Sequence, residues 1–147
     1  MEFHFAPNLI FKALAFALAT LPMVIYNLRT GMITNLYNAV ILLAGIGVLA
    51  LGPTFGMSGF SLHSLGFWTL SAIVFLFFYK RGWIHGGATK FFIALLPWFS
   101  QNEYISVASC GLLVAAVIGL TLRHKEPQIA PSVVVCGLIA LVVSAAH

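Results

Sequence analysis

Six apolar stretches, separated by short polar breaks, run along the 147 residues of the chain. Most approach the ~20 residues that a helix needs to cross a hydrocarbon core about 30 Å thick. We therefore expect a single all-α membrane domain over residues 1–147, a polytopic protein with about six transmembrane helices. The expected helices are Asn8–Tyr26, Leu36–Leu51, Leu62–Tyr79, Lys90–Phe99, Tyr104–Leu122 and Ile129–Ala146.

The fourth stretch, Lys90–Phe99, is short for a crossing and contains Pro97. A helix of about ten residues spans only about half of the hydrocarbon core. This segment is therefore tilted, re-entrant, or continuous with a helical part of the preceding glycine-containing stretch. Between the second and third stretches, Thr54–Ser61 contains two glycines and no charge, which predicts a loop.

Composition excludes a soluble globule, because 61% of the residues are hydrophobic and only 7% are charged, against ~25% charged in soluble domains. The net charge of +4 does not indicate a nucleic-acid partner, since the basic residues are dispersed along the chain.

Six of the seven lysine and arginine residues follow the first, third and fifth expected helices. The positive-inside rule then places those three connections in the cytoplasm and both termini outside. The six are Arg29, Lys80, Arg81, Lys90, Arg123 and Lys125.

No metal or cofactor is predicted from the cysteines and histidines. Cys110 and Cys136 each lie inside an apolar stretch and are not spaced as a C-x-x-C motif, so we interpret them as small apolar side chains. His85 has no partner at metal-ligand spacing and is interpreted as a polar loop residue.

Two stretches next to expected helix ends carry unusual polar patterns. Tyr26–Asn35 reads YNLRTGMITN, and Trp83–Phe92 reads WIHGGATKFF with adjacent glycines Gly86 and Gly87. A glycine pair permits φ > 0 and close approach of another group to the backbone. Taken alone, the second stretch is also compatible with a simple turn between two membrane helices.

Together the two stretches resemble motifs of the prepilin peptidases, the type IV leader peptidases. The resemblance is to the short tight-adherence-pilus form, which lacks the methylating insert. In this family the first helix leads into D-x-R-x-x-x-I-P-N, and a later loop reads G-x-G-D-x-K. The first motif matches at Arg29, Ile33 and Asn35, and the second matches at Gly87 and Lys90.

This resemblance implies a membrane aspartic endopeptidase of the bacterial inner membrane that removes prepilin leaders at the cytoplasmic face. Its partners would be a prepilin and the surrounding lipid. The family's catalytic aspartates fall at Asn27 and Ala88, and Thr34 replaces the usual proline. The chain contains no aspartate, and its three glutamates lie away from both motifs. Because an amide or a methyl group cannot exchange the required proton, we expect binding without cleavage.

Several alternatives remain open at this point. Asn27 and Ala88 are substitutions that a deliberate inactivation would use to trap an uncut substrate, and they also fit a natural pseudo-peptidase. Arg29 and Lys90 either contact substrate carbonyls or lipid phosphates, or simply anchor the cytoplasmic side. Asn35 either contacts substrate or caps the second helix.

Gly86 and Gly87 are expected to bend the backbone so that position 88 faces position 27.

A non-enzymatic scaffold for pilus or secretion assembly is the rival function. It would explain the missing carboxylates but not the paired motifs. A small-molecule carrier is less favoured, because no inverted repeat is detectable.

Overall fold

The computed structural model describes residues 7–52, 61–122 and 129–145, and every regular element in these ranges is helical. The all-α prediction is therefore confirmed. The expected loop Thr54–Ser61 lies largely outside the described residues, as do Arg123 and Lys125. The elements are α1 (Pro7–Thr30), α2 (Asn35–Leu51), α3 (Leu62–Lys80), α4 (Gly86–Leu95), the 3₁₀ helix η2 (Leu96–Trp98), α5 (Gln101–Leu122) and α6 (Ile129–Ala145).

Helix α1 continues further than its apolar stretch predicts. The expected end was Tyr26, but the helix extends to Thr30 and includes Asn27 and Arg29. Gly31 ends it with a positive φ of 71°, and its N–H donates to the carbonyl of Asn27 at 2.8 Å. This is a common glycine termination of a helix. The first half of the first motif is therefore helical rather than a loop.

The glycine pair does not bend the chain as the sequence suggested. Gly86 and Gly87 form the first turn of α4, which begins after His85. The turn is instead made at Gly82, where φ is 74° and the backbone N–H donates to the carbonyl of Tyr79 at 2.9 Å. The fourth helix is thus continuous with the glycine stretch, one of the three alternatives considered for it.

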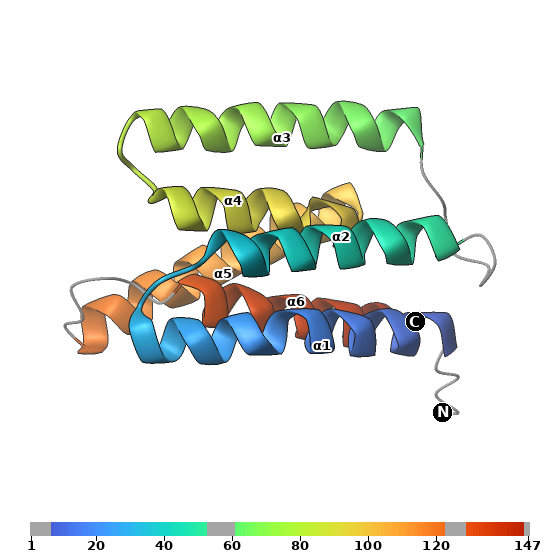
Figure 1. The fold of residues 1–147 in the computed structure, drawn as a ribbon, viewed down its shortest axis with the longest axis horizontal. Helices are drawn as coiled ribbons and strands as arrows, with labels where there is room; N and C mark the ends of the chain where they lie inside the picture. Colours follow the sequence, from blue (N-terminus) through green and yellow to red (C-terminus); the bar gives the residue numbers. More distant parts are fainter. Residues whose placement is uncertain (1–6, 53–60, 123–128, 146–147) are drawn as a thin grey trace.

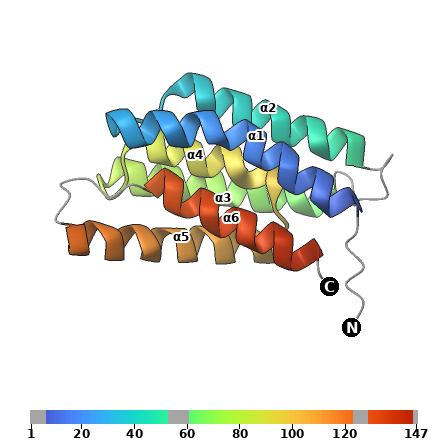
Figure 2. The same cartoon turned by 90° about the horizontal axis from the view of Figure 1, so that it is seen from below.

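The helices alternate in direction, so that the bundle has two distinct ends (Figure 1). Helices α1, α3 and α5 finish at one end, where α2, α4 and α6 begin, and Figure 2 shows the same alternation from below. Helix α4 has 10 residues, but η2 continues it toward the opposite end, where α5 begins. Helix α4 and η2 therefore run antiparallel to α3 and to α5 within the bundle.

Aromatic side chains form the centre of the bundle. Phe16 on α1 packs edge-on against Trp98 and Phe99, with ring centroids 5.2 and 5.3 Å away. The indole N–H of Trp98 donates to the carbonyl of Ile41 at 2.9 Å, which fixes η2 against α2. Such a bond satisfies a polar atom that would otherwise be costly to bury.

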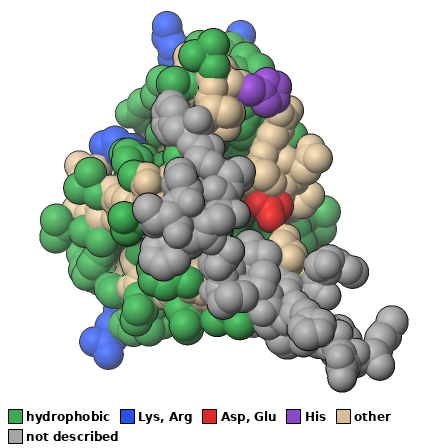
Figure 3. Space-filling model, turned by 90° about the vertical axis from the view of Figure 1, so that its right-hand side faces the viewer, with side chains coloured by type: hydrophobic (Ala, Val, Ile, Leu, Met, Phe, Trp, Pro, Cys, Tyr) green, Lys and Arg blue, Asp and Glu red, His purple; other side chains and the backbone are tan. Residues whose placement is uncertain are grey.

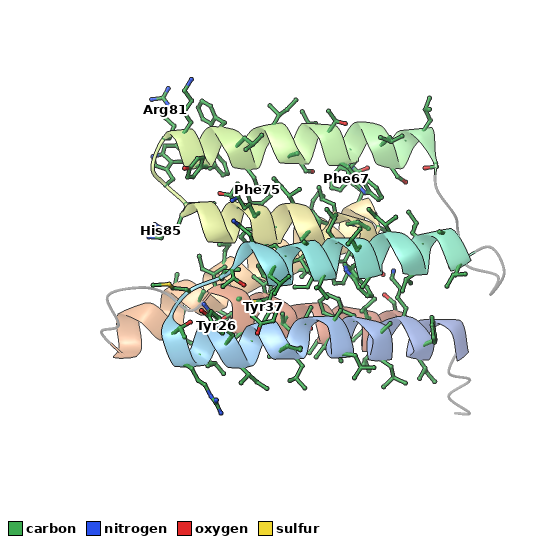
Figure 4. All side chains as sticks on the ribbon, in the orientation of Figure 1. Tyr26, Tyr37, Phe67, Phe75, Arg81 and His85 are labelled. Carbon is green, nitrogen blue, oxygen red and sulfur yellow. The ribbon has the colours of Figure 1, made fainter. Side chains whose placement is uncertain are left out.

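Helix α3 is held at the edge of the bundle by a second aromatic group. The ring of Phe75 stacks on that of Phe92 in α4, with centroids 4.6 Å apart and an interplanar angle of 11°. The Phe67 ring lies 5.7 Å from that of Tyr104 on α5, whose hydroxyl donates to the carbonyl of Phe92 at 2.9 Å. In Figure 4, Phe67 and Phe75 both point from α3 toward α4.

The outer surface is as apolar as a membrane protein requires. Three helices are long and apolar enough to cross a membrane, over Ile10–Thr30, Leu62–Lys80 and Gln101–Ile118, while α2 and α6 are shorter apolar helices. Large apolar side chains face outward, including Leu18 at 74% and Leu43 at 67% exposure. Figure 3, which views the right-hand end of the bundle, shows hydrophobic side chains over much of the described part of that face. Exposed leucines on this scale are typical of contact with lipid.

Candidate functional site

The two motifs lie at the same end of the bundle, where α1 ends and where α2 and α4 begin (Figures 1 and 4). The first motif spans the last turn of α1, the connection through Gly31, and the start of α2. The second forms the start of α4. We refer to this region, residues 26–38 and 85–90, as the motif end. Three contacts described below join its parts.

A hydrogen bond directly links one residue of the first stretch to one residue of the second. The ammonium Nζ of Lys90 donates to the side-chain Oδ1 of Asn35 at 2.8 Å. The prediction that Asn35 caps the second helix is wrong, because Thr34 occupies the N-cap and Asn35 is already helical. The Asn35 oxygen instead accepts from a cation on a different helix. Both side chains are exposed, so the bond adds little to the stability of the fold.

Gly87 allows α4 to approach the connection that precedes α2. A Cβ built on Gly87 would lie 2.9 Å from the carbonyl oxygen of Ile33 and 3.3 Å from its Cβ. No side chain fits at 2.9 Å from a backbone oxygen without displacing the backbone. The sequence-based expectation of close approach is therefore confirmed here. At Gly86 the neighbour of a built Cβ is the ring of Tyr79, at 3.2 Å.

The two positions of the family's aspartates are both buried at this end. Asn27 and Ala88 are each 4% exposed. The side-chain Oδ1 of Asn27 accepts no hydrogen bond from any described residue. Such an atom is uncommon in folded proteins, and burying it unpaired costs about 1–3 kcal/mol. The carboxamide oxygen of Asn27 therefore has no hydrogen-bond donor in the described part of the chain.

Asn38 is a further residue at the motif end, and the motif comparison did not identify it. Its side-chain amide donates to the carbonyl of Gly87 at 3.4 Å, across from α2 to α4. Its Oδ1 accepts no hydrogen bond from the described residues, although the residue is only 5% exposed. The signal in the sequence is an asparagine one turn inside the apolar stretch Leu36–Leu51. Polar residues inside membrane helices commonly have a function.

The basic residues near the motif end are exposed. Arg29 lies in the last turn of α1, and Lys80 ends α3. The guanidinium of Arg81, which follows α3, lies 5.2 Å from the centroid of the Phe77 ring. Figure 4 shows Arg81 and His85 at this end of the bundle. His85 occupies the N-cap of α4 without a side-chain capping bond.

The carboxylate of Glu103 lies at the opposite end, near the start of α5. It accepts from the backbone N–H and hydroxyl of Ser100, both at 2.9 Å, and from the hydroxyl of Ser144 at 2.8 Å. Figure 3 views this end, where acidic side-chain atoms reach the surface. Glu103 is the only acidic side chain among the described ranges, since Glu2 and Glu126 fall outside them. It therefore cannot replace a carboxylate at position 27 or 88.

Comparisons with models of known protein families, with curated proteins and with solved structures find no match to this chain. What this chain can bind or catalyse must therefore be inferred from the residues of the motif end. Neutral amides, backbone carbonyls and two cations can bind a peptide or a phosphate. They cannot activate water as a pair of carboxylates does.

Proposed function

We propose that this chain is a membrane protein of the prepilin-peptidase type that binds prepilins at the cytoplasmic membrane face and does not hydrolyse them. Active members of the type are aspartic endopeptidases that remove the prepilin leader. This chain keeps the binding part of that activity. Deliberate inactivation and natural loss of the aspartates both lead to this same behaviour.

The observation that carries the proposal is the direct contact between two motifs that are far apart in sequence. The Lys90–Asn35 hydrogen bond of 2.8 Å joins a residue that matches one motif to a residue that matches the other. Gly87, also a motif residue, packs against the backbone of Ile33. A scaffold protein has no need for these particular residues to meet, whereas a peptide-binding site built from both motifs does.

The proposed lack of cleavage follows from what occupies positions 27 and 88. An amide at Asn27 keeps the size of an aspartate without its proton chemistry, and the methyl group of Ala88 has no polar atom. The carboxylate of Glu103 is engaged by Ser100 and Ser144 at the other end of the bundle. Water at the motif end would therefore have no pair of carboxylates to act on it.

The location of the substrate follows from charge. The described residues Arg29, Lys80, Arg81 and Lys90 all lie at or near the motif end, and the positive-inside rule assigns such an end to the cytoplasm. A prepilin leader lies in the cytoplasm and its apolar helix lies in the bilayer. The junction between them would then be level with Asn27 and Ala88. The proposed location is the bacterial inner membrane.

The decisive experiment restores the missing carboxylates. The double variant Asn27→Asp with Ala88→Asp, reconstituted in liposomes, should cleave a prepilin of the source organism, whereas the unchanged protein should bind it without product. The matched control is Asn27→Asp with Ala88→Asn, which has nearly the same size but only one carboxylate and should not cleave. Absence of product from a correctly folded double variant would contradict the proposed relation to the peptidases.

A pilus or secretion scaffold is the second candidate, and the methyl group of Ala88 favours it, since no polar function remains at that position. Binding assays separate the two functions. The proposed function requires that capture of a prepilin depends on the leader and is weakened by changes at Gly87. A scaffold would hold its partner equally well when the leader is deleted.

A further inference from the structure

Two buried carboxamide oxygens at the motif end lack hydrogen-bond donors among the described residues. They are Oδ1 of Asn27, near the end of α1, and Oδ1 of Asn38, in the second turn of α2. Their neighbours in sequence, Tyr26 and Tyr37, touch, with ring centroids 5.5 Å apart. Figure 4 shows these two tyrosines side by side between α1 and α2. The two asparagines therefore lie at the same end of the bundle, on two helices that pack against each other.

The side chain of Asn38 has a fixed orientation. Its NH₂ group donates to the carbonyl of Gly87, so its oxygen cannot exchange places with the nitrogen without losing that bond. The oxygen is therefore the atom of this side chain that has no donor among the described residues. Two unpaired amide oxygens, each costing about 1–3 kcal/mol, are better explained by a ligand with hydrogen-bond donors than by packing.

The chemistry of the two acceptors limits the ligand. Both are neutral, and both residues are at least nine-tenths buried. A cation entering such a place would lose its hydration without gaining an opposite charge. A peptide N–H carries no net charge and matches an amide oxygen well. The first four N–H groups of any helix have no acceptor within that helix.

We propose that Asn27 and Asn38 accept hydrogen bonds from the first turn of the substrate's apolar helix, acting as a helix cap supplied by the binding protein. This inference rests on the proposed function and adds Asn38 as a substrate-binding residue. Asparagine is among the best capping residues because its side-chain oxygen accepts from free backbone N–H groups. The start of the substrate helix is also the point where the leader joins it.

The test removes single N–H groups from the ligand and leaves the protein intact. The probe is a synthetic peptide with a short Lys- and Arg-containing leader joined to an apolar helix of ~20 residues. Ester bonds replace single amides either in the first turn of the helix or, as the control, two turns later. Affinity for the protein in lipid nanodiscs is measured for the unchanged chain, for Asn27→Leu, for Asn38→Leu, and for Asn102→Leu, which alters an exposed asparagine on α5.

One or two first-turn esters should weaken binding to the unchanged protein and to Asn102→Leu by about threefold to tenfold, the value of one hydrogen bond. In Asn38→Leu and in Asn27→Leu, the ester at the N–H group bound by the substituted asparagine should have no further effect, whereas the ester at the N–H group bound by the remaining asparagine should still weaken binding. Later esters should affect all proteins equally. The ester series on the unchanged protein remains informative if Asn38→Leu does not fold.

Two outcomes would overturn the inference, and they are distinguishable. If the unchanged protein binds the peptide but first-turn and later esters weaken binding equally, the capping role is wrong and leader binding stands. If the unchanged protein does not bind any form of the peptide, the proposed function is wrong as well.

Discussion

The two ends of this helical bundle use polar groups in opposite ways. At the end where α5 begins, Glu103 accepts three hydrogen bonds, from Ser100 and Ser144, and Lys12 interacts with it electrostatically. At the motif end, the buried oxygens of Asn27 and Asn38 accept none from the described residues. The carboxylate of the first end is engaged by its neighbours, whereas two carboxamide oxygens of the motif end have no donor among the described residues.

The difference indicates where stability and function reside. Buried polar groups that are fully hydrogen-bonded hold a fold together, whereas unpaired ones are tolerated mainly where binding or catalysis requires them. We therefore assign a structural role to Lys12 of α1 and to Glu103 of α5, despite their charges. The neutral asparagines and glycines of the motif end are the residues to which we assign the proposed binding. Substitutions at the Glu103 end should mainly change the free energy of unfolding, and substitutions at the motif end should also change peptide affinity.

The largest expected effect on stability is at the Glu103 end. Glu103→Ala removes the acceptor for Ser100 and Ser144 and should lower the free energy of unfolding by about 3 kcal/mol, the scale of hydrogen bonds to a charged group. Thermal unfolding in detergent, followed by circular dichroism, measures the change. Affinity for a prepilin peptide should not change, because this carboxylate is remote from the motif end.

Asn102→Ala is the control for that substitution, since Asn102 is the exposed neighbour of Glu103 on the same helix. It should unfold at nearly the temperature of the unchanged protein. If Glu103→Ala weakened peptide binding while leaving stability intact, the assignment of the two ends would be reversed.

A smaller effect on stability, accompanied by a loss of binding, is expected at the motif end. Gly87→Ala forces a Cβ to within 2.9 Å of the Ile33 carbonyl oxygen. Gly86→Ala in the same helical turn meets only the Tyr79 ring, which can rotate away. Both variants gain the helix propensity of alanine. Gly87→Ala should therefore be less stable than Gly86→Ala by about 2 kcal/mol, a typical cost of overpacking, and should bind prepilin peptide more weakly. Equal stability and equal binding in the two variants would show that the α4 contact with Ile33 has no importance.

The positions of the helices could be predicted from the sequence, because long apolar stretches allow few other structures. Helix α3 ends within one residue of its predicted limit at Tyr79, and α6 begins at Ile129 as expected. The end of α1 was predicted too early, because the apolar stretch is interrupted at the polar residues Asn27, Arg29 and Thr30. They are helical because the positive φ needed for termination is available only at Gly31.

Details of the candidate site were harder to predict, because they depend on contacts between helices. The motif pattern drew attention to Asn27, Gly87 and Lys90. It did not reveal that Asn35 would accept from Lys90, nor that Asn38 would reach the carbonyl of Gly87. Such pairings are separated by about fifty residues or more in sequence and follow only from how α2 packs on α4.

The most direct test of the account is to locate the bound leader by photo-crosslinking. A prepilin peptide with a photoreactive residue at the junction of leader and apolar helix is bound to the unchanged protein in nanodiscs, irradiated, and mapped by mass spectrometry. Adducts confined to residues 26–38 and 85–90 are the predicted result. Adducts around Glu103 and the start of α5, or adducts that persist when the leader is deleted, would contradict it.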